Sequence, residues 1–112
     1  MKNEDRIRLQ HMLDAARDAL SFAEGRVRED LEADRQLALA VVKCVEIIGE
    51  AASQVSPETQ GELPELPWPK MVAMRHRLVH TYYDINLDVV WSTLGEDLPP
   101  LVETLQVILG RA

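Results

Sequence analysis

Residues 36–55 read QLALAVVKCVEIIGEAASQV and form the most apolar long segment of the chain. On a helix with 3.6 residues per turn, apolar side chains would cover nearly its whole circumference, so we predict a long helix at the centre of the fold. Gly49 in this segment would let a neighbouring backbone pack closely. The polar exceptions gather on one side of the helix: Gln36, Lys43, Glu46, Glu50 and Gln54.

Two further segments have the apolar spacing of amphipathic helices. The first segment is residues 3–25, before the central helix, with Gly25 as a plausible end. The second is residues 86–109, at the C-terminal side, where Asn86 is suited to cap the helix. Pro99 and Pro100 should kink or briefly break that last helix, because proline lacks a backbone N–H. The charged residues 26–35 are predicted to connect two helices, with one helical turn of their own.

Prolines and a glycine interrupt the chain between residues 56 and 69: Pro57, Gly61, Pro64, Pro67 and Pro69. A third long helix is predicted over residues 68–80, followed by a turn over residues 81–85. No segment alternates polar and apolar residues as a half-buried strand would. The expected class is therefore all-α, an up-and-down four- to five-helix bundle in a single domain that spans residues 1–112.

Composition limits the possible functions. The chain has 112 residues and a net charge of −7, which argues against broad, nonspecific binding to nucleic acid or anionic membranes. The single cysteine, Cys44, excludes an internal disulfide and suits a reducing compartment, so we expect a cytoplasmic protein. Its place in an apolar run favours a buried side chain over a reactive thiol. No apolar run approaches the roughly 20 residues of a membrane span.

The stretch 74–84, MRHRLVHTYYD, concentrates the chemically useful side chains. Arg75 falls in the apolar stripe of the predicted third helix, where an unpaired guanidinium would be costly to bury. Either a carboxylate meets it, or this face lines a polar crevice or a subunit interface. Glu46 and Glu50 are the candidate carboxylates; the alternative is that they belong to a narrow stripe facing solvent.

Residues 66–83 contain no acidic side chain, although the chain as a whole is acidic. Any polyanion should therefore bind here, and we expect Lys70, His76 and Arg77 to contact its phosphate groups. His76 and His80 have the i, i+4 spacing that two metal ligands on one helix face require. However, no glutamate follows His76 as in HExxH motifs, so we predict neither a metal nor any other cofactor.

Arginine and histidine without a metal suit the cleavage of RNA phosphodiesters, because the 2′-hydroxyl of RNA is itself the nucleophile. The protein needs an acid or base that works near neutral pH, for which His80 is suited, and a cation for the charge on phosphorus, for which Arg75 is suited. The alternative is structural: Arg75 would form a salt bridge and His80 would bond to carbonyl groups at a helix end.

The residues from Arg75 to Tyr82 fit the pattern R-x4-H-x-Y, which resembles the motif of the HEPN superfamily and specifically its HepT-like branch of toxin ribonucleases. The similarity extends to VEIIGEAA at residues 45–52, to Trp68-Pro69, and to residues 71–74, 83–91 and 97–101. It implies a homodimer formed through the helices around the motif, with Arg75 and His80 of both subunits in one composite site. Residues expected at that interface are Met71, Leu78 and Val79.

The same resemblance implies a metal-independent endoribonuclease toxin of a toxin–antitoxin pair, with a small nucleotidyltransferase as the antitoxin. Such a partner can adenylylate the motif tyrosine, here Tyr82, and the added negative charge would compete with RNA phosphate. His76 departs from the branch, which commonly has asparagine after the arginine. Two other functions remain possible: a non-catalytic module that binds RNA, a nucleotide or a partner protein, and a purely structural helical dimer.

Overall fold

The computed structural model describes residues 1–81 and 84–111, and helices make up most of it. Its long elements are α1 (Asn3–Phe22), α3 (Arg35–Gln54), α5 (Trp68–Leu78) and a C-terminal run of α6 (Leu87–Ser92), η1 (Thr93–Asp97) and α7 (Leu98–Leu109). Two short helices, α2 (Asp30–Ala33) and α4 (Pro57–Glu62), lie in the connections. The prediction of an all-α fold is confirmed, and so is the helical turn within residues 26–35.

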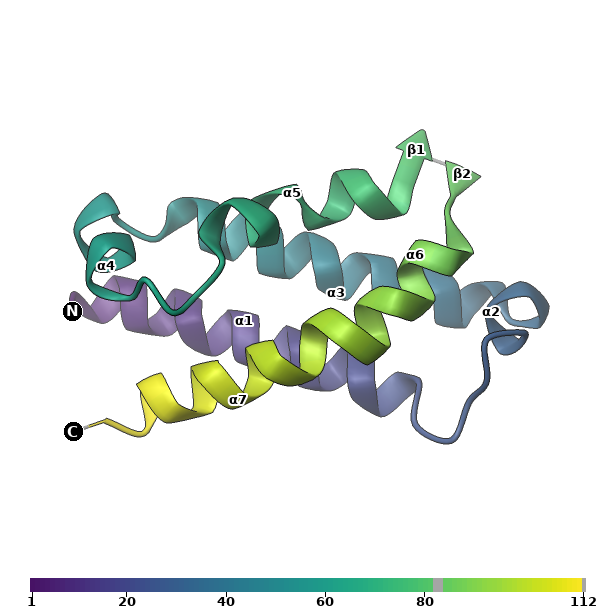
Figure 1. The fold of residues 1–112 in the computed structure, drawn as a ribbon, viewed down its shortest axis with the longest axis horizontal. Coiled ribbons are helices and arrows are strands. Elements are labelled where there is room, and N and C mark those ends of the chain that lie inside the picture. The colour runs from purple at the N-terminus through teal and green to yellow at the C-terminus, as the bar shows by residue number, and fades with distance from the viewer. Residues whose placement is uncertain (82–83, 112) are drawn as a thin grey trace.

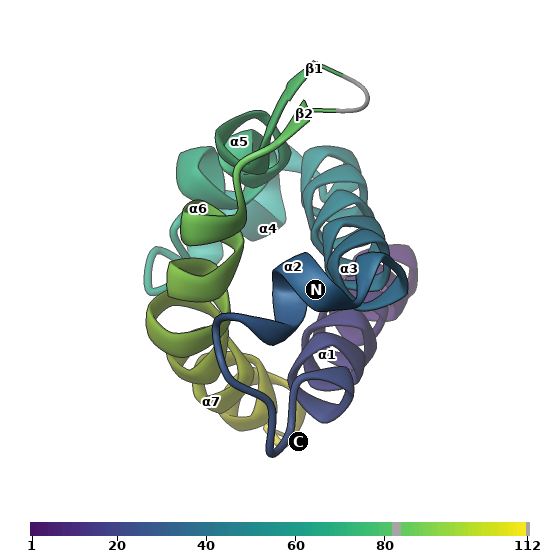
Figure 2. The same ribbon diagram turned by 90° about the vertical axis from the view of Figure 1, so that its right-hand side faces the viewer.

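The long helices run up and down and close into a ring (Figures 1 and 2). Helix α3 packs against α1 and α5, and α7 returns to pack against α1. As predicted, α3 supplies much of the core, because its apolar residues meet neighbours on several sides; Val41, Val45, Ile48 and Ala52 are fully buried. None of the described helices combines the length and the apolar character needed to span a lipid bilayer.

Helix starts follow local capping rules. The carboxylate of Asp34 accepts a hydrogen bond from the backbone N–H of Leu37 at the start of α3. At the start of α4, the hydroxyl of Ser56 accepts a hydrogen bond from the backbone N–H of Thr59. The side chain of Asn86 accepts from the N–H of Val89 and caps α6, as predicted. These caps satisfy backbone donors that have no partner within the helix.

The third long helix is shorter than predicted. Helix α5 ends at Leu78, and the chain continues as a small antiparallel pair, β1 (Val79–Thr81) and β2 (Asp84–Ile85). Figure 2 shows this hairpin projecting beyond the ring of helices, above α5. The predictions of a helix to residue 80 and of no strand are therefore wrong, because the sequence VHTYYDI is rich in β-branched and aromatic residues that favour extended backbone.

The C-terminal helix stays continuous across Pro99 and Pro100, which lie in the first turn of α7. The predicted distortion takes the form of a π-helical turn, η1, directly before them. Proline lacks the N–H that would bond to the carbonyl four residues earlier and crowds that carbonyl, so the preceding turn widens.

Three residues expected at a subunit interface belong to the core of the single chain instead. Met71 and Leu78 are fully buried and Val79 is 7% exposed. Met71 and Leu78 face inward because α5 turns this side toward α3 and α6. Val79 is buried on β1, directly after the helix ends. On the outer side of α5, Val72 is 44% exposed and takes their place as the apolar surface residue.

Candidate functional site

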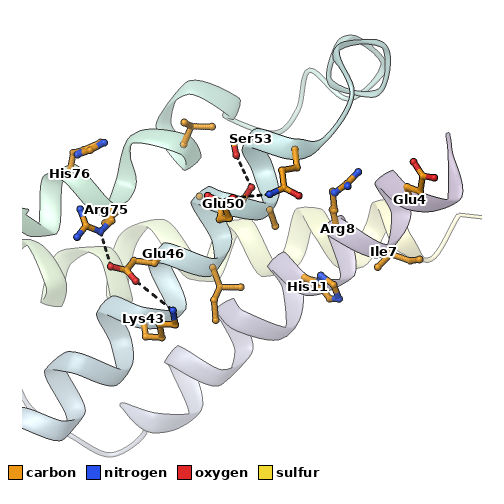
Figure 3. A pocket seen from close by; sticks show the side chains of 15 residues that line it. Glu4, Ile7, Arg8, His11, Lys43, Glu46, Glu50, Ser53, Arg75 and His76 are labelled. Carbon is orange, nitrogen blue, oxygen red and sulfur yellow. Dashed lines mark hydrogen bonds and ion pairs between the residues drawn. The ribbon is translucent and has the colours of Figure 1, made fainter.

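A groove of about 840 Å³ runs across the outer surface of α1, α3 and α5 (Figure 3). Its apolar part includes Ile7, Ile47 and Val72, one from each helix, and all three are substantially exposed. Charged and polar side chains from the same three helices also line it: Glu4, Arg8, His11, Lys43, Glu46, Glu50, Ser53, Gln54, Arg75 and His76. The groove is therefore an apolar depression with cations and anions interspersed around it.

Arg75 lies at one end of this groove, and its side chain is 40% exposed. Its Nε donates a hydrogen bond of 2.7 Å to Oε1 of Glu46, so the predicted carboxylate partner is confirmed (Figure 3). Glu46 also lies 3.8 Å from Nζ of Lys43. Glu50 instead accepts a hydrogen bond from Gln54. Glu46 therefore meets Arg75, as the first alternative predicted. Glu50 does not, and it fits the second alternative, a stripe facing solvent.

The position of this ion pair depends on how closely α5 crosses α3. A Cβ atom at Gly49 would lie 3.2 Å from the carbonyl oxygen of Met71 and 3.4 Å from that of Val72. The missing side chain thus allows the two backbones to approach, as predicted. Glu46 and Arg75 each lie about one helical turn from this contact, which brings the carboxylate and the guanidinium together.

The hydrogen bond to Glu46 uses Nε and leaves the outer edge of the guanidinium available. Within residues 1–81 and 84–111, neither Nη1 nor Nη2 of Arg75 has a hydrogen-bond partner. A guanidinium presents its donors in a rigid fork that suits two oxygens of a phosphate. Arg75 is therefore oriented by one carboxylate and still able to bind an anion at the groove.

The two histidines of the motif lie in different surroundings. His76 is exposed in the last turn of α5 and lines the groove beside Arg75 (Figure 3). His80 is exposed on β1 and is absent from the described residues that line the groove. Because α5 ends between them, they no longer have the i, i+4 relation of one helix. Among the described residues, no group of three potential metal ligands occurs.

Lys70 and Arg77, expected to contact phosphate, share one carboxylate on another side of α5. Nζ of Lys70 lies 2.8 Å from Oδ1 of Asp97, and Nη1 of Arg77 lies 3.5 Å from Oδ2. The side chain of Asp97 is only 10% exposed, whereas both cations are about half exposed. These pairs join α5 to η1. A phosphate contact by either cation stays a prediction, and it would be separate from the groove.

Sequence reasoning missed two parts of this arrangement. Asp97 precedes Leu98-Pro99-Pro100, and nothing in the local pattern indicates that its partners lie on α5. His11 is exposed on α1 and lines the groove with Arg8, and the spacing within the first helix alone does not indicate this position. Predicting it would require knowing which side of α1 lies next to the groove face of α3. The predicted modification site, Tyr82, lies outside the described residues.

Comparisons with known proteins agree on one family. The model of the family described as "Ribonuclease HepT-like" matches residues 12–108. A Thermococcus cleftensis protein named "Probable ribonuclease HepT" is 33% identical over 101 residues, 90% of this chain and 92% of its own. A Caldanaerobacter subterraneus protein named "Putative RNase TTE0752" is 31% identical over 103 residues, 92% of each chain. No solved structure matches the chain significantly. The chain therefore belongs to the HepT-like ribonuclease family.

Proposed function

We propose that this protein is a metal-independent endoribonuclease toxin whose active site contains Arg75 and His80. The observation that carries the proposal is the set of contacts and the exposure of the Arg75 side chain in a HepT-like chain. A carboxylate holds its Nε, its side chain is 40% exposed at a groove, and its terminal nitrogens have no partner among the described residues. This is the arrangement expected of an arginine that binds a phosphate rather than one that only stabilises the fold.

The proposed reaction uses the 2′-hydroxyl of RNA as the nucleophile. Arg75 binds the nonbridging oxygens and stabilises the additional negative charge that develops on them. His80 transfers a proton to or from the reacting oxygens. Glu46 keeps the guanidinium in one orientation, so that little conformational freedom is lost when RNA binds. The products would be a 2′,3′-cyclic phosphate and a free 5′-hydroxyl.

The test is RNA cleavage by the purified protein in EDTA, with product ends identified by mass spectrometry. Arg75→Ala and His80→Ala should each lower the rate by at least about 100-fold. Arg17→Ala is the matched control, because Arg17 is an exposed arginine of α1 outside the groove. Far-UV circular dichroism must show that each variant is folded. Cleavage that survives both active-site substitutions would refute the proposal, and affinity without turnover would favour a non-catalytic RNA-binding module.

The proposal includes a homodimer that forms over the groove and places two copies of the motif in one composite site. It is supported by the three exposed apolar residues Ile7, Ile47 and Val72, and by charges of both signs that suit a self-complementary face. Ile47→Glu should convert the dimer to a monomer in sedimentation analysis. Val107→Glu is the control, since Val107 is 62% exposed on α7, away from this groove. A monomeric parent protein, or an Ile47→Glu variant that still dimerises, would contradict it.

The proposed antitoxin is a nucleotidyltransferase that adenylylates Tyr82. Adding a nucleotide introduces a phosphate and bulk two residues from His80, which would compete with RNA for the same cations. Co-expression with the neighbouring chromosomal gene product should add one adenylyl group to the protein and suppress its toxicity. Tyr82→Phe should abolish the added mass, whereas Tyr83→Phe should retain it. The reverse result would assign the modification to Tyr83.

A further inference from the structure

Helix α5 carries cationic side chains on two opposite flanks. Arg75 lies on the flank next to α3, where it lines the groove and bonds to Glu46. Lys70 and Arg77 lie on the other flank, about two helical turns apart, where both pair with Asp97 of η1. Figure 2 shows α5 between α3 and α6 in the ring of helices, so the side between these two flanks faces outward.

One carboxylate cannot neutralise both Lys70 and Arg77. Nζ of Lys70 lies 2.8 Å from Oδ1 of Asp97, whereas Nη1 of Arg77 makes a longer contact of 3.5 Å with Oδ2. Within the described part of the chain, Nε and Nη2 of Arg77 have no partner, and Glu96, the other acid of η1, pairs with neither cation. The carboxylate is nearly buried and both cations are about half exposed. A ligand at this flank therefore meets positive charge.

The outward side of α5 offers RNA a more favourable path than the length of the groove does. Glu4, Glu46 and Glu50 line the groove, and the proposed homodimer covers it. Helix α5 itself contains no acidic residue, and the exposed residues on its outward side include Ala73 and His76. A strand that extends from a phosphate at the groove is therefore attracted across α5 to the opposite flank.

On this basis, and resting on the proposed ribonuclease function, we infer that Lys70 and Arg77 form a second phosphate-binding site for single-stranded RNA. The scissile phosphate lies at Arg75 on one flank of α5, and a phosphate of a neighbouring nucleotide lies at Lys70 and Arg77 on the other. Asp97 positions these two cations without touching the RNA. The site contributes affinity and no chemistry, and it reads no base, because a phosphate contact carries no sequence information.

The first test measures affinity without turnover. Binding of a fluorescent, non-cleavable 2′-deoxy oligonucleotide to the full chain is followed by anisotropy between about 50 and 200 mM salt. Lys70→Gln and Arg77→Gln should each lower the slope of log K against log salt by about 0.7 and weaken binding about fivefold near 0.1 M salt. Arg17→Gln, an exposed arginine of α1 outside the groove, should match the parent protein.

Asp97→Asn distinguishes phosphate binding from a purely structural role of these ion pairs. Removing the anion frees both cations, so this variant should bind the oligonucleotide at least as tightly as the parent protein, although its fold is less stable. If the three residues acted only through the fold, all three substitutions would weaken binding alike. That result, or unchanged affinity and salt slope in Lys70→Gln and Arg77→Gln, would overturn the inference.

The second test compares cleavage of a dinucleoside monophosphate, which has only the scissile phosphate, with cleavage of a longer oligouridine. Arg77→Gln should raise KM for the longer RNA about fivefold, leave kcat within about twofold, and leave kcat/KM for the short substrate unchanged. Equal losses with both substrates would overturn the inference while the proposed function stands. If the parent protein binds through Lys70 and Arg77 but cleaves neither substrate, the proposed function fails and the phosphate site stands. A parent protein that does not bind the oligonucleotide would overturn both.

Discussion

Replacing Asp5 with asparagine should destabilise the native state at neutral pH, and the effect should shrink as the pH falls. Asp5 is 1% exposed and accepts three hydrogen bonds. Oδ2 receives the hydroxyls of Ser56 and Thr59, each at 2.6 Å, and Oδ1 receives the backbone N–H of Ser56 at 3.0 Å. These bonds join α1 to the cap of α4. Asparagine would keep one oxygen and direct an N–H₂ group at donors.

The magnitude follows from the proton equilibrium of this carboxyl group. Hydrogen bonds from Ser56 and Thr59 lower the pKa of Asp5 from its usual 3.8 to about 2. Since the folded-state pKa is below the unfolded one, the stabilisation is present well above pH 3.8 and is lost as the pH falls toward 2. It amounts to about 2 kcal/mol at pH 7 and about 1 kcal/mol at pH 3.

The assay is urea unfolding followed by circular dichroism at pH 7, 5 and 3 for the parent protein and Asp5→Asn. The free energy of unfolding should differ by about 2 kcal/mol at pH 7 and by about half of that at pH 3. Asp14→Asn is the control, because Asp14 is exposed on the same helix and should change stability by less than about 0.5 kcal/mol. An Asp5→Asn deficit that is equal at both pH values would refute the electrostatic argument.

Three other predictions concern the packing that supports the site. Gly49→Val should destabilise the fold by about 1–3 kcal/mol in urea unfolding and lower RNA cleavage, because the added side chain would separate α3 from α5. Gly61→Ala is the control: open space surrounds Gly61, so stability and cleavage should stay nearly unchanged. Asp97→Asn should destabilise the fold by about 1 kcal/mol, because Lys70 and Arg77 lose their anionic partner. The loss should be larger at low salt than at high salt, whereas Glu96→Gln, at an exposed position, should have no measurable effect. Burial raises the pKa of the Cys44 thiol, so iodoacetamide should alkylate it at least about tenfold more slowly in the native protein than in urea; equal rates would show that the thiol is accessible.

Much of the site could be predicted from sequence because its chemistry is concentrated in one short segment. Arg75, His76 and His80 stand out as cations in an acid-free stretch, and the motif places them in a family. The need of a half-buried guanidinium for a carboxylate was enough to nominate Glu46 and Glu50. Helical periodicity could not choose between them, because both lie on the same side of the predicted helix.

The end of α5 was harder to predict because two local tendencies compete there. The apolar spacing of residues 68–80 favours one continuous helix, whereas Val79 and the residues after it favour extended backbone. In the structure Val79 is 7% exposed and paired with Ile85, so the hairpin buries it without extending the helix. This difference separates His80 from the helix that carries Arg75 and His76.

The order of apolar and polar residues determined the helices, their caps and the central position of α3, because those properties depend on spacing within one segment and on the burial of its apolar face. Tertiary packing determined which carboxylate meets Arg75, that His76 and His11 line one groove, and that Asp97 holds two cations of α5. These contacts join residues distant in sequence. They depend on how closely α5 crosses α3 at Gly49 and on where the π-helical turn places Asp97, and no periodicity within a single segment specifies either.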